Sequence, residues 1–141
     1  MSSRVFFYGL YMDVELLESM GFQPKSVGAA KLVDYSLDIG ERATLVPDPG
    51  RVTYGYLLDL DDDEVSKLYS RPEVVDYRAE SVEAVLLIDG SKHRALCYIL
   101  PESKLGGKTN TAYAEKLATL VWKLGLPAEY ANEIARHEND T

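Results

Sequence analysis

Tyrosine is the residue type that offers the most chemistry in this chain, since 10 of its 141 residues are tyrosines. A tyrosine combines an apolar ring with a hydroxyl group that can both donate and accept a hydrogen bond. Several tyrosines lie next to glycine or charged residues, as in Tyr8-Gly9 and Asp76-Tyr77-Arg78. Such residues can line a pocket for a small molecule, but taken alone the pattern favours half-buried packing on strands.

A second candidate for binding chemistry is the segment of residues 5–12. Its first four residues, Val-Phe-Phe-Tyr, predict a short buried strand, which Gly9 ends in front of a predicted helix. A turn in this position can leave backbone N–H groups free to bind an anion, such as a substrate carboxylate. Many ordinary turns have the same pattern, so an anion-binding loop and a structural turn are both open at this point.

The residue types that build most other active sites are isolated in this sequence. Cys97 lies within an apolar strand pattern, which indicates a buried structural thiol rather than a nucleophile. His93 and His137 flank charged stretches, and neither has a serine elbow motif to complete a triad. The acidic run 61–64 lacks the alternating ligands, central glycine and distal glutamate of a calcium loop. We therefore expect no catalytic triad and no metal site.

The charge and length of the chain limit its partners. It has 15 Lys plus Arg against 23 Asp plus Glu, a formal net charge of −8. Binding to a phosphate backbone requires clustered cations, so we expect no nucleic-acid partner. No run approaches the ~20 apolar residues of a membrane-spanning helix, and the apolar start is too short for a signal sequence. We expect one domain over residues 1–141, in the cytoplasm and without a membrane partner.

The elements that must position these residues are mainly strands, with helices early, midway and at the end. The residue pattern predicts strands over 5–8, 32–39, 43–46, 52–60, 77–88 and 93–100. The run Pro-Asp-Pro-Gly at 47–50 predicts a turn between two of them. Helices are predicted after Asp13, after the acidic run, and in the last third, where Gly125 ends one helix and Pro127 begins another. This layout predicts an α+β fold rather than a regular βαβ alternation.

Four segments, in order along the chain, carry a resemblance to a known family. They are Phe-Tyr-Gly-Leu-Tyr-Met at 7–12, the stretch 43–56 that begins Ala-Thr-Leu-Val-Pro-Asp-Pro-Gly, Glu-Val-Val-Asp-Tyr-Arg at 73–78, and Thr-Ala-Tyr at 111–113 with Leu-Gly-Leu-Pro-Ala-Glu-Tyr at 124–130. Each is similar to a motif of the γ-glutamylcyclotransferase-like family, which includes the AIG2-like and γ-glutamylamine cyclotransferase branches. Together these segments extend over nearly the whole chain.

The resemblance implies a small mixed β-barrel with flanking helices and a reaction that needs no cofactor. In that reaction the α-amino group of a γ-glutamyl substrate attacks the substrate's own γ-carbonyl carbon. The product is 5-oxoproline, and an amine or amino acid is released. A carboxylate must accept a proton from the attacking ammonium and can later protonate the leaving amine.

The same resemblance assigns roles to seven residues. Glu73 is the candidate acid and base. The loop of Tyr8, Gly9, Leu10 and Tyr11 is the candidate cradle for the substrate carboxylate and the polarised carbonyl, and Tyr77 and Tyr113 are candidate orienting groups. The partner implied is a small γ-glutamyl molecule, and the sequence leaves the leaving amine and the oligomeric state open.

The chain departs from the family pattern around the glutamate. The usual Leu-Asp-x-x-Glu-Gly becomes Leu-Tyr-Ser-Arg-Pro-Glu-Val at 68–74, so Tyr69 replaces the aspartate, Glu73 comes one residue late and the glycine is missing. Leu10 and Tyr11 stand where small or polar residues are usual. Glu80 is the rival carboxylate. It follows Tyr77 by three residues, which on a regular strand would put the two side chains on opposite faces.

Three functional hypotheses follow. The first is an enzyme that cyclises a γ-glutamyl amine or dipeptide. The second is a non-catalytic member of the same fold that binds a small carboxylate or amide, motivated by the altered glutamate segment. The third, a plain interaction module, depends only on the acidic surface and is the least favoured.

Overall fold

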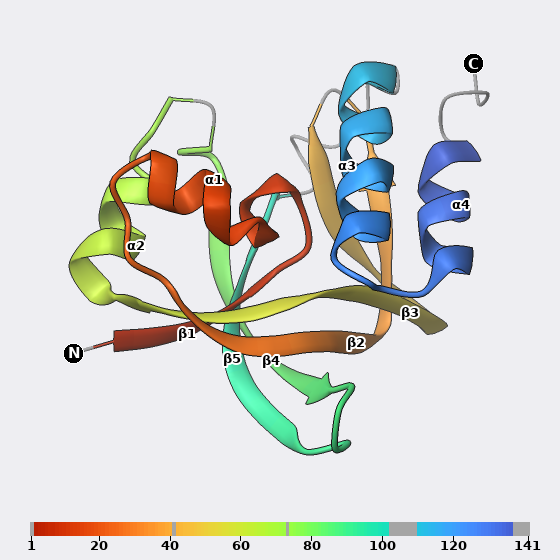
Figure 1. Ribbon diagram of the computed structural model, residues 1–141, viewed down its shortest axis with the longest axis horizontal. Coiled ribbons are helices and arrows are strands. Elements are labelled where there is room, and N and C mark those ends of the chain that lie inside the picture. Colours follow the sequence, from red (N-terminus) through yellow and green to blue (C-terminus); the bar gives the residue numbers. More distant parts are fainter. Residues whose placement is uncertain (1, 41, 73, 102–109, 137–141) are drawn as a thin grey trace.

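Five strands close into a barrel in the order β1-β3-β2-β4-β5 (Figure 1). The computed structural model describes residues 2–40, 42–72, 74–101 and 110–136. The strands are β1 (Ser2–Phe7), β2 (Lys25–Ile39), β3 (Ala43–Asp61), β4 (Arg78–Leu86) and β5 (Lys92–Ile99). All neighbours pair antiparallel except β1 and β5, which meet in parallel at the single pair Val5 and Leu96. The predicted barrel of an α+β fold is confirmed.

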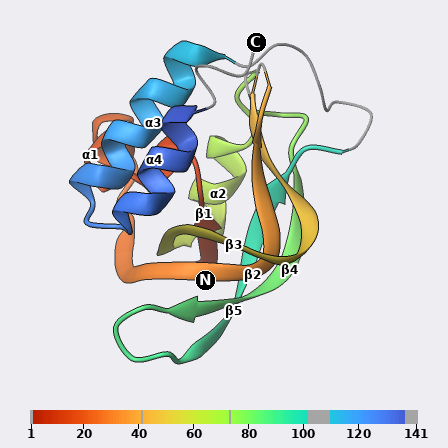
Figure 2. The same cartoon turned by 90° about the vertical axis from the view of Figure 1, so that its right-hand side faces the viewer.

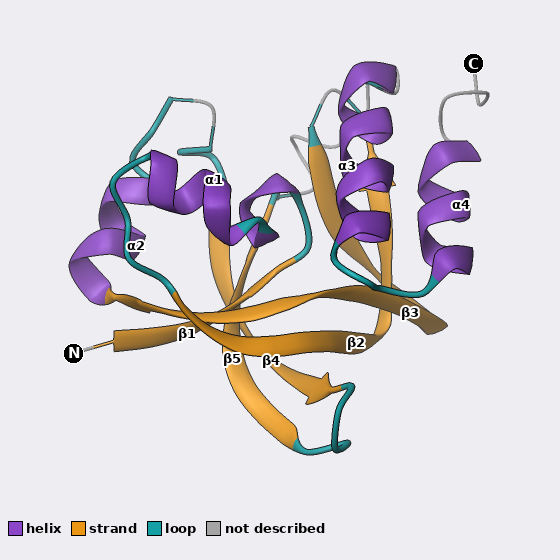
Figure 3. Cartoon of the chain, in the orientation of Figure 1, coloured by secondary structure: helices purple, strands orange, loops and turns teal. Residues whose placement is uncertain are grey.

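The helices lie together on one side of the strands, and the β4–β5 hairpin projects on the other (Figures 2 and 3). They are the 3₁₀ helix η1 (Leu10–Met12) and the α-helices α1 (Val14–Ser19), α2 (Asp62–Leu68), α3 (Thr111–Lys123) and α4 (Ala128–Arg136). In the described part of the chain, none of them has the length and apolar character needed to cross a membrane.

Side chains cap the helices that carry or adjoin the candidate residues. Asp13 accepts a hydrogen bond from the N–H of Glu15 at 3.1 Å and so begins α1, as predicted. Asn110 accepts one from the N–H of Tyr113 at 3.0 Å, which begins α3. These caps fix the two helices on either side of the Tyr8–Tyr11 loop at their N-terminal ends.

The predicted turn at Pro47–Gly50 is wrong, because β3 runs without interruption from Ala43 to Asp61. Its register with β2 moves from the pair Val33 and Val52 to the pair Tyr35 and Pro47, so residues 48–51 lie opposite Asp34 alone. Asp34 has a φ of +70°, and its carboxylate accepts a hydrogen bond from Gly50 at 2.9 Å. Both halves of β3 pair with the same partner strand, so the Pro-Gly run forms a bulge instead of reversing the chain.

The barrel interior is filled by alternate residues of the strands. On β4 these are Val82, Ala84 and Leu86, which are buried, and Cys97 of β5 is fully buried beside them. Burial raises the pKa of the Cys97 thiol, and the nearby charge of Glu80 adds to the effect. The thiol therefore remains protonated at neutral pH, in agreement with the structural role predicted for it.

Glycine at position 55 permits the close approach of β1 and β3. A Cβ atom added there would overlap the backbone carbonyl oxygen of Phe7 and lie 2.9 Å from the ring of Phe6. Backbone atoms cannot move aside as a flexible side chain can. We expect Gly55→Ala to lower the free energy of unfolding by about 1–3 kcal/mol, the usual cost of overpacking, or more. Chemical denaturation would measure this, and an unchanged stability would contradict the close approach.

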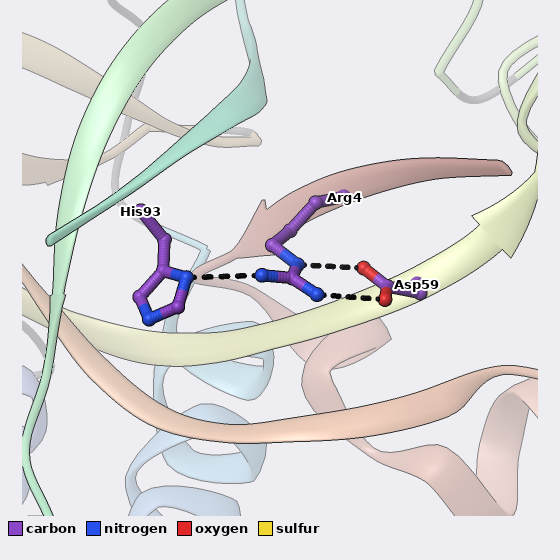
Figure 4. Close-up of polar contacts among 3 residues, drawn as sticks. All are labelled: Arg4, Asp59 and His93. Atoms are coloured by element: carbon purple, nitrogen blue, oxygen red, sulfur yellow. Dashed lines mark hydrogen bonds and ion pairs between the residues drawn. The ribbon is translucent and has the colours of Figure 1, made fainter. Parts of the chain in front are cut away.

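A group of charged side chains links the strands at the parallel seam of the barrel (Figure 4). Arg4 of β1 donates two hydrogen bonds to Asp59 of β3, at 2.8 and 3.0 Å. It also donates one to Nδ1 of His93 on β5, at 2.9 Å. A guanidinium can only donate, so Nδ1 must be unprotonated in this arrangement. The seam is thus held by side chains as well as by the single backbone pair.

Acid is expected to destabilise the protein through Asp59. The hydrogen bonds from Arg4 lower the pKa of its carboxyl in the folded state. The stabilisation that the Arg4–Asp59 pair contributes is complete above about 3.9, the pKa of the aspartate in the unfolded chain. It is lost as the pH falls through the lower pKa that Asp59 has in the folded protein. The melting temperature should therefore fall less steeply between about pH 6 and pH 3 for Asp59→Asn than for the natural protein. Glu83→Gln, which removes an exposed pair with Lys92 at 3.9 Å, should leave the steepness unchanged.

Candidate active site

The end of β1, the loop that follows it and parts of β3, β5 and α3 surround a pocket of about 310 Å³. Its volume is at the lower end of the range for small-molecule sites, roughly 300–1,000 Å³. All six residues that the sequence assigned to substrate binding line it: Tyr8, Gly9, Leu10, Tyr11, Tyr77 and Tyr113. They come from three regions of the chain that are far apart in sequence.

The loop after β1 contacts the Tyr113 side chain of helix α3 closely at Gly9 and Leu10. The Tyr113 hydroxyl accepts a hydrogen bond from the N–H of Leu10 at 3.3 Å. A Cβ atom added to Gly9 would lie 2.5 Å from that hydroxyl oxygen, too close for any real contact. Burial raises the pKa of the Tyr113 hydroxyl. It therefore keeps its proton at neutral pH and can donate it in a hydrogen bond to a ligand.

Tyr77 lies just before β4, with its ring under the guanidinium of Arg42, 5.7 Å from the ring centroid. Its hydroxyl donates to the backbone carbonyl of Ala43. Burial raises the pKa of Tyr77 to about 12, although the charge of Arg42 opposes the shift. Arg42 also forms an ion pair with Asp76 at 3.3 Å. Tyr77 is thus a neutral residue of the pocket wall, and Asp76 partly balances the positive charge of Arg42 beside it.

Tyr8 is buried, and its hydroxyl donates to the backbone carbonyl of Tyr98 at 2.6 Å. Burial raises the pKa of this hydroxyl well above its ordinary value. The tyrosines of the pocket that make these contacts cannot serve as proton acceptors near neutral pH.

Several wall residues had not been predicted from the sequence. Phe7, Tyr69 and Tyr98 line the pocket, as does Arg42. The rings of Tyr69 and Tyr98 stack with centroids 3.7 Å apart. One sequence signal was available, because Tyr69 replaces the usual aspartate of the resembled motif. Tyr98 and Arg42 carried no comparable signal.

The structure describes one of the two candidate carboxylates, Glu80. Glu73 lies outside the described residues, and Val74, which follows it, lines the pocket. Glu80 is exposed, pairs with Cys97 across β4 and β5, and is not among the pocket residues. Among the described wall residues there is a cation, Arg42, but no carboxylate.

No metal site competes with this pocket in the described residues, where no three His, Cys, Asp or Glu side chains are gathered in a way that could hold an ion. The described wall offers hydrogen-bond donors and aromatic rings.

Comparison with known proteins gives a family match over most of the chain. A family model described as gamma-glutamyl cyclotransferase, AIG2-like, matches residues 5–123. No match was found among curated proteins. The matched range contains all six predicted binding residues and Glu73.

Solved structures agree with the fold. A structure named gamma-glutamyl cyclotransferase superposes with a TM-score of 0.83 and 19% identity, over 95% of this chain and 86% of that one. YkqA from Bacillus subtilis superposes with a TM-score of 0.79 and 24% identity, over 98% of this chain and 54% of that one. An uncharacterized protein of Homo sapiens, loc79017, superposes with a TM-score of 0.78 and 19% identity, over 94% of this chain and 86% of that one. Likeness at such identities supports the barrel, whereas function must be argued from the site.

Proposed function

We propose that this chain, which belongs to the gamma-glutamyl cyclotransferase, AIG2-like family, converts a γ-glutamyl amine or dipeptide to 5-oxoproline. One observation carries the proposal. The six residues expected to bind such a substrate surround a single pocket, and Val74, the neighbour of Glu73, belongs to the same wall. The family match supports a cyclotransferase-like function, and the pocket supports a small-molecule substrate.

The reaction needs no water and no bound cofactor to balance. The α-amino nitrogen, as the free base, attacks the γ-carbonyl carbon and forms a five-membered ring. The bond from that carbon to the leaving nitrogen then breaks, and the proton lost by the attacking nitrogen ends on the leaving one. In this proposal Glu73 accepts the proton and later donates it.

The negative charge that develops on the carbonyl oxygen needs hydrogen-bond donors. The backbone of the loop at Gly9 and the protonated hydroxyl of Tyr113 are the groups proposed for this role. The raised pKa of Tyr113 keeps it a donor throughout the neutral range. Tyr77, with a pKa of about 12, is proposed to orient the substrate by contact and not to move protons.

A second candidate function is binding without turnover. The observation in its favour is Tyr69, which fills the position of the usual aspartate and contributes an aromatic ring to the pocket wall. A binding member would be stabilised thermally by a γ-glutamyl ligand without forming 5-oxoproline. Turnover of any γ-glutamyl compound would exclude it.

The test of the proposed function is a panel assay. Purified protein, shown to be folded by circular dichroism, is incubated with γ-glutamyl amines and γ-glutamyl dipeptides, and 5-oxoproline is measured by mass spectrometry. We expect 5-oxoproline from at least one member of the panel. Its absence across the whole panel would overturn the proposal.

A further inference from the structure

Four aromatic rings form a continuous series along one part of the pocket wall. Phe7 meets Tyr11 edge to face, with centroids 6.4 Å apart, and Tyr11 meets Tyr69 in the same way at 6.4 Å. Tyr69 then stacks on Tyr98 at 3.7 Å and 8°. The series joins the loop after β1, the end of α2 and β5, and all four rings line the pocket.

The polar tips of the other pocket tyrosines are already engaged. The hydroxyls of Tyr8 and Tyr77 donate to backbone carbonyls, and that of Tyr113 accepts from the N–H of Leu10. Tyr8 and Tyr77 therefore present mainly ring surface to a ligand, whereas the Tyr113 hydroxyl still has its proton to donate. We assign the charged glutamyl half of the substrate to the polar groups that border the pocket, namely the loop backbone, the Tyr113 hydroxyl and the Arg42 guanidinium.

On the basis of the proposed function, we infer that the group released from the substrate is flat and apolar, such as an amino acid with an aromatic side chain. An aromatic group can pack edge to face or offset against tyrosine and phenylalanine rings. Its burial in a ring-lined pocket is favourable because apolar surface leaves water.

A leaving group that ends in charged groups gains less from the same wall. Lysine released from its Nε-conjugate has a flexible chain that ends in an ammonium and a carboxylate, and both charges lose hydration if they are buried against rings.

Three conjugates test this inference: γ-glutamylphenylalanine, γ-glutamylglycine and Nε-(γ-glutamyl)lysine. The first two differ only in the benzyl group. We expect kcat/KM for the phenylalanine conjugate to exceed that for the other two by about tenfold or more, since apolar pockets discriminate single methylene groups by ~10-fold or more. Equal or faster turnover of the glycine or lysine conjugate would overturn the inference and leave the proposed function intact.

A variant at the wall makes the test specific. Tyr98→Leu removes one ring of the stack, and the ratio of kcat/KM between the phenylalanine and glycine conjugates should fall to near one. Trp122→Leu is the matched control, because Trp122 is 65% exposed on α3 and does not line the pocket, so its ratio should equal that of the natural protein. If the ratio of kcat/KM between the phenylalanine and glycine conjugates is unchanged in Tyr98→Leu, the ring series does not set the preference.

If other members of the γ-glutamyl panel are turned over but none of these three conjugates is, the inference fails and the proposed function stands. If the whole panel is inert, the proposed function fails, and the preference can still be measured by binding. Thermal stabilisation by the three conjugates is then compared at equal concentration. A larger shift with the phenylalanine conjugate supports the aromatic preference of the pocket, and equal shifts overturn it.

Discussion

Glu73→Gln is expected to reduce the turnover of a γ-glutamyl substrate by about 10²- to 10⁴-fold, the usual contribution of general acid–base catalysis. Glutamine keeps the size and most of the hydrogen bonding of glutamate but cannot accept the proton. Binding should therefore change little, which a thermal-shift titration would check. Tyr8, Tyr77 and Tyr113 cannot replace the lost base, because burial raises the pKa values of their hydroxyls.

Glu80→Gln is the matched control for this variant. Glu80 is exposed on β4 and does not line the pocket, so its substitution should leave turnover close to that of the natural protein. If Glu80→Gln abolished turnover in a folded protein and Glu73→Gln did not, the catalytic role would belong to Glu80. If both variants kept full activity, the proposed mechanism would be wrong.

Gly9→Ala is expected to lower kcat/KM by about 10²-fold, because displacements of about 1 Å in a positioning group can have that effect. The new methyl group would lie 2.5 Å from the Tyr113 hydroxyl, so the loop and the α3 side chain must separate. Steady-state kinetics on the best substrate of the panel would measure the loss. Denaturation melts would show whether the fold is retained.

A double variant identifies the cause of this loss. In Gly9→Ala with Tyr113→Phe the hydroxyl is gone, and the nearest remaining Tyr113 atom, the carbon that carried it, is 3.9 Å from the added methyl group. The loop should then return to its position. The double variant should have the activity of Tyr113→Phe alone, within a few-fold. Additive losses from the two substitutions would show that the contact at Gly9 is not the reason.

The residues that line the pocket could be predicted in part because several of them are adjacent in a short motif. Tyr8 to Tyr11 form one loop, and the sequence signals around it, a buried strand ending in glycine, are local. The stacking of Tyr69 on Tyr98 could not be predicted in the same way. One ring follows α2 and the other lies on β5, and only closure of the barrel brings them together.

The bulge in β3 is a case in which a local sequence pattern predicted the wrong structure. Pro47, Pro49 and Gly50 are typical turn residues, and by themselves they indicate a chain reversal. The long β2 strand offers pairing to both halves of β3, and Asp34 adopts the left-handed conformation that absorbs the extra residues. Pairing between strands therefore decided the structure where local propensity indicated a turn.

The most direct test of the proposed function follows the oxygen atoms of the product. The protein is incubated in ¹⁸O-labelled water with the γ-glutamyl compound that it processes fastest, beside a sample without protein. Intramolecular cyclisation predicts 5-oxoproline and the released amine in equal amounts, with no ¹⁸O in either. Formation of glutamate carrying ¹⁸O would show hydrolysis by water and would contradict attack by the substrate's own amino group.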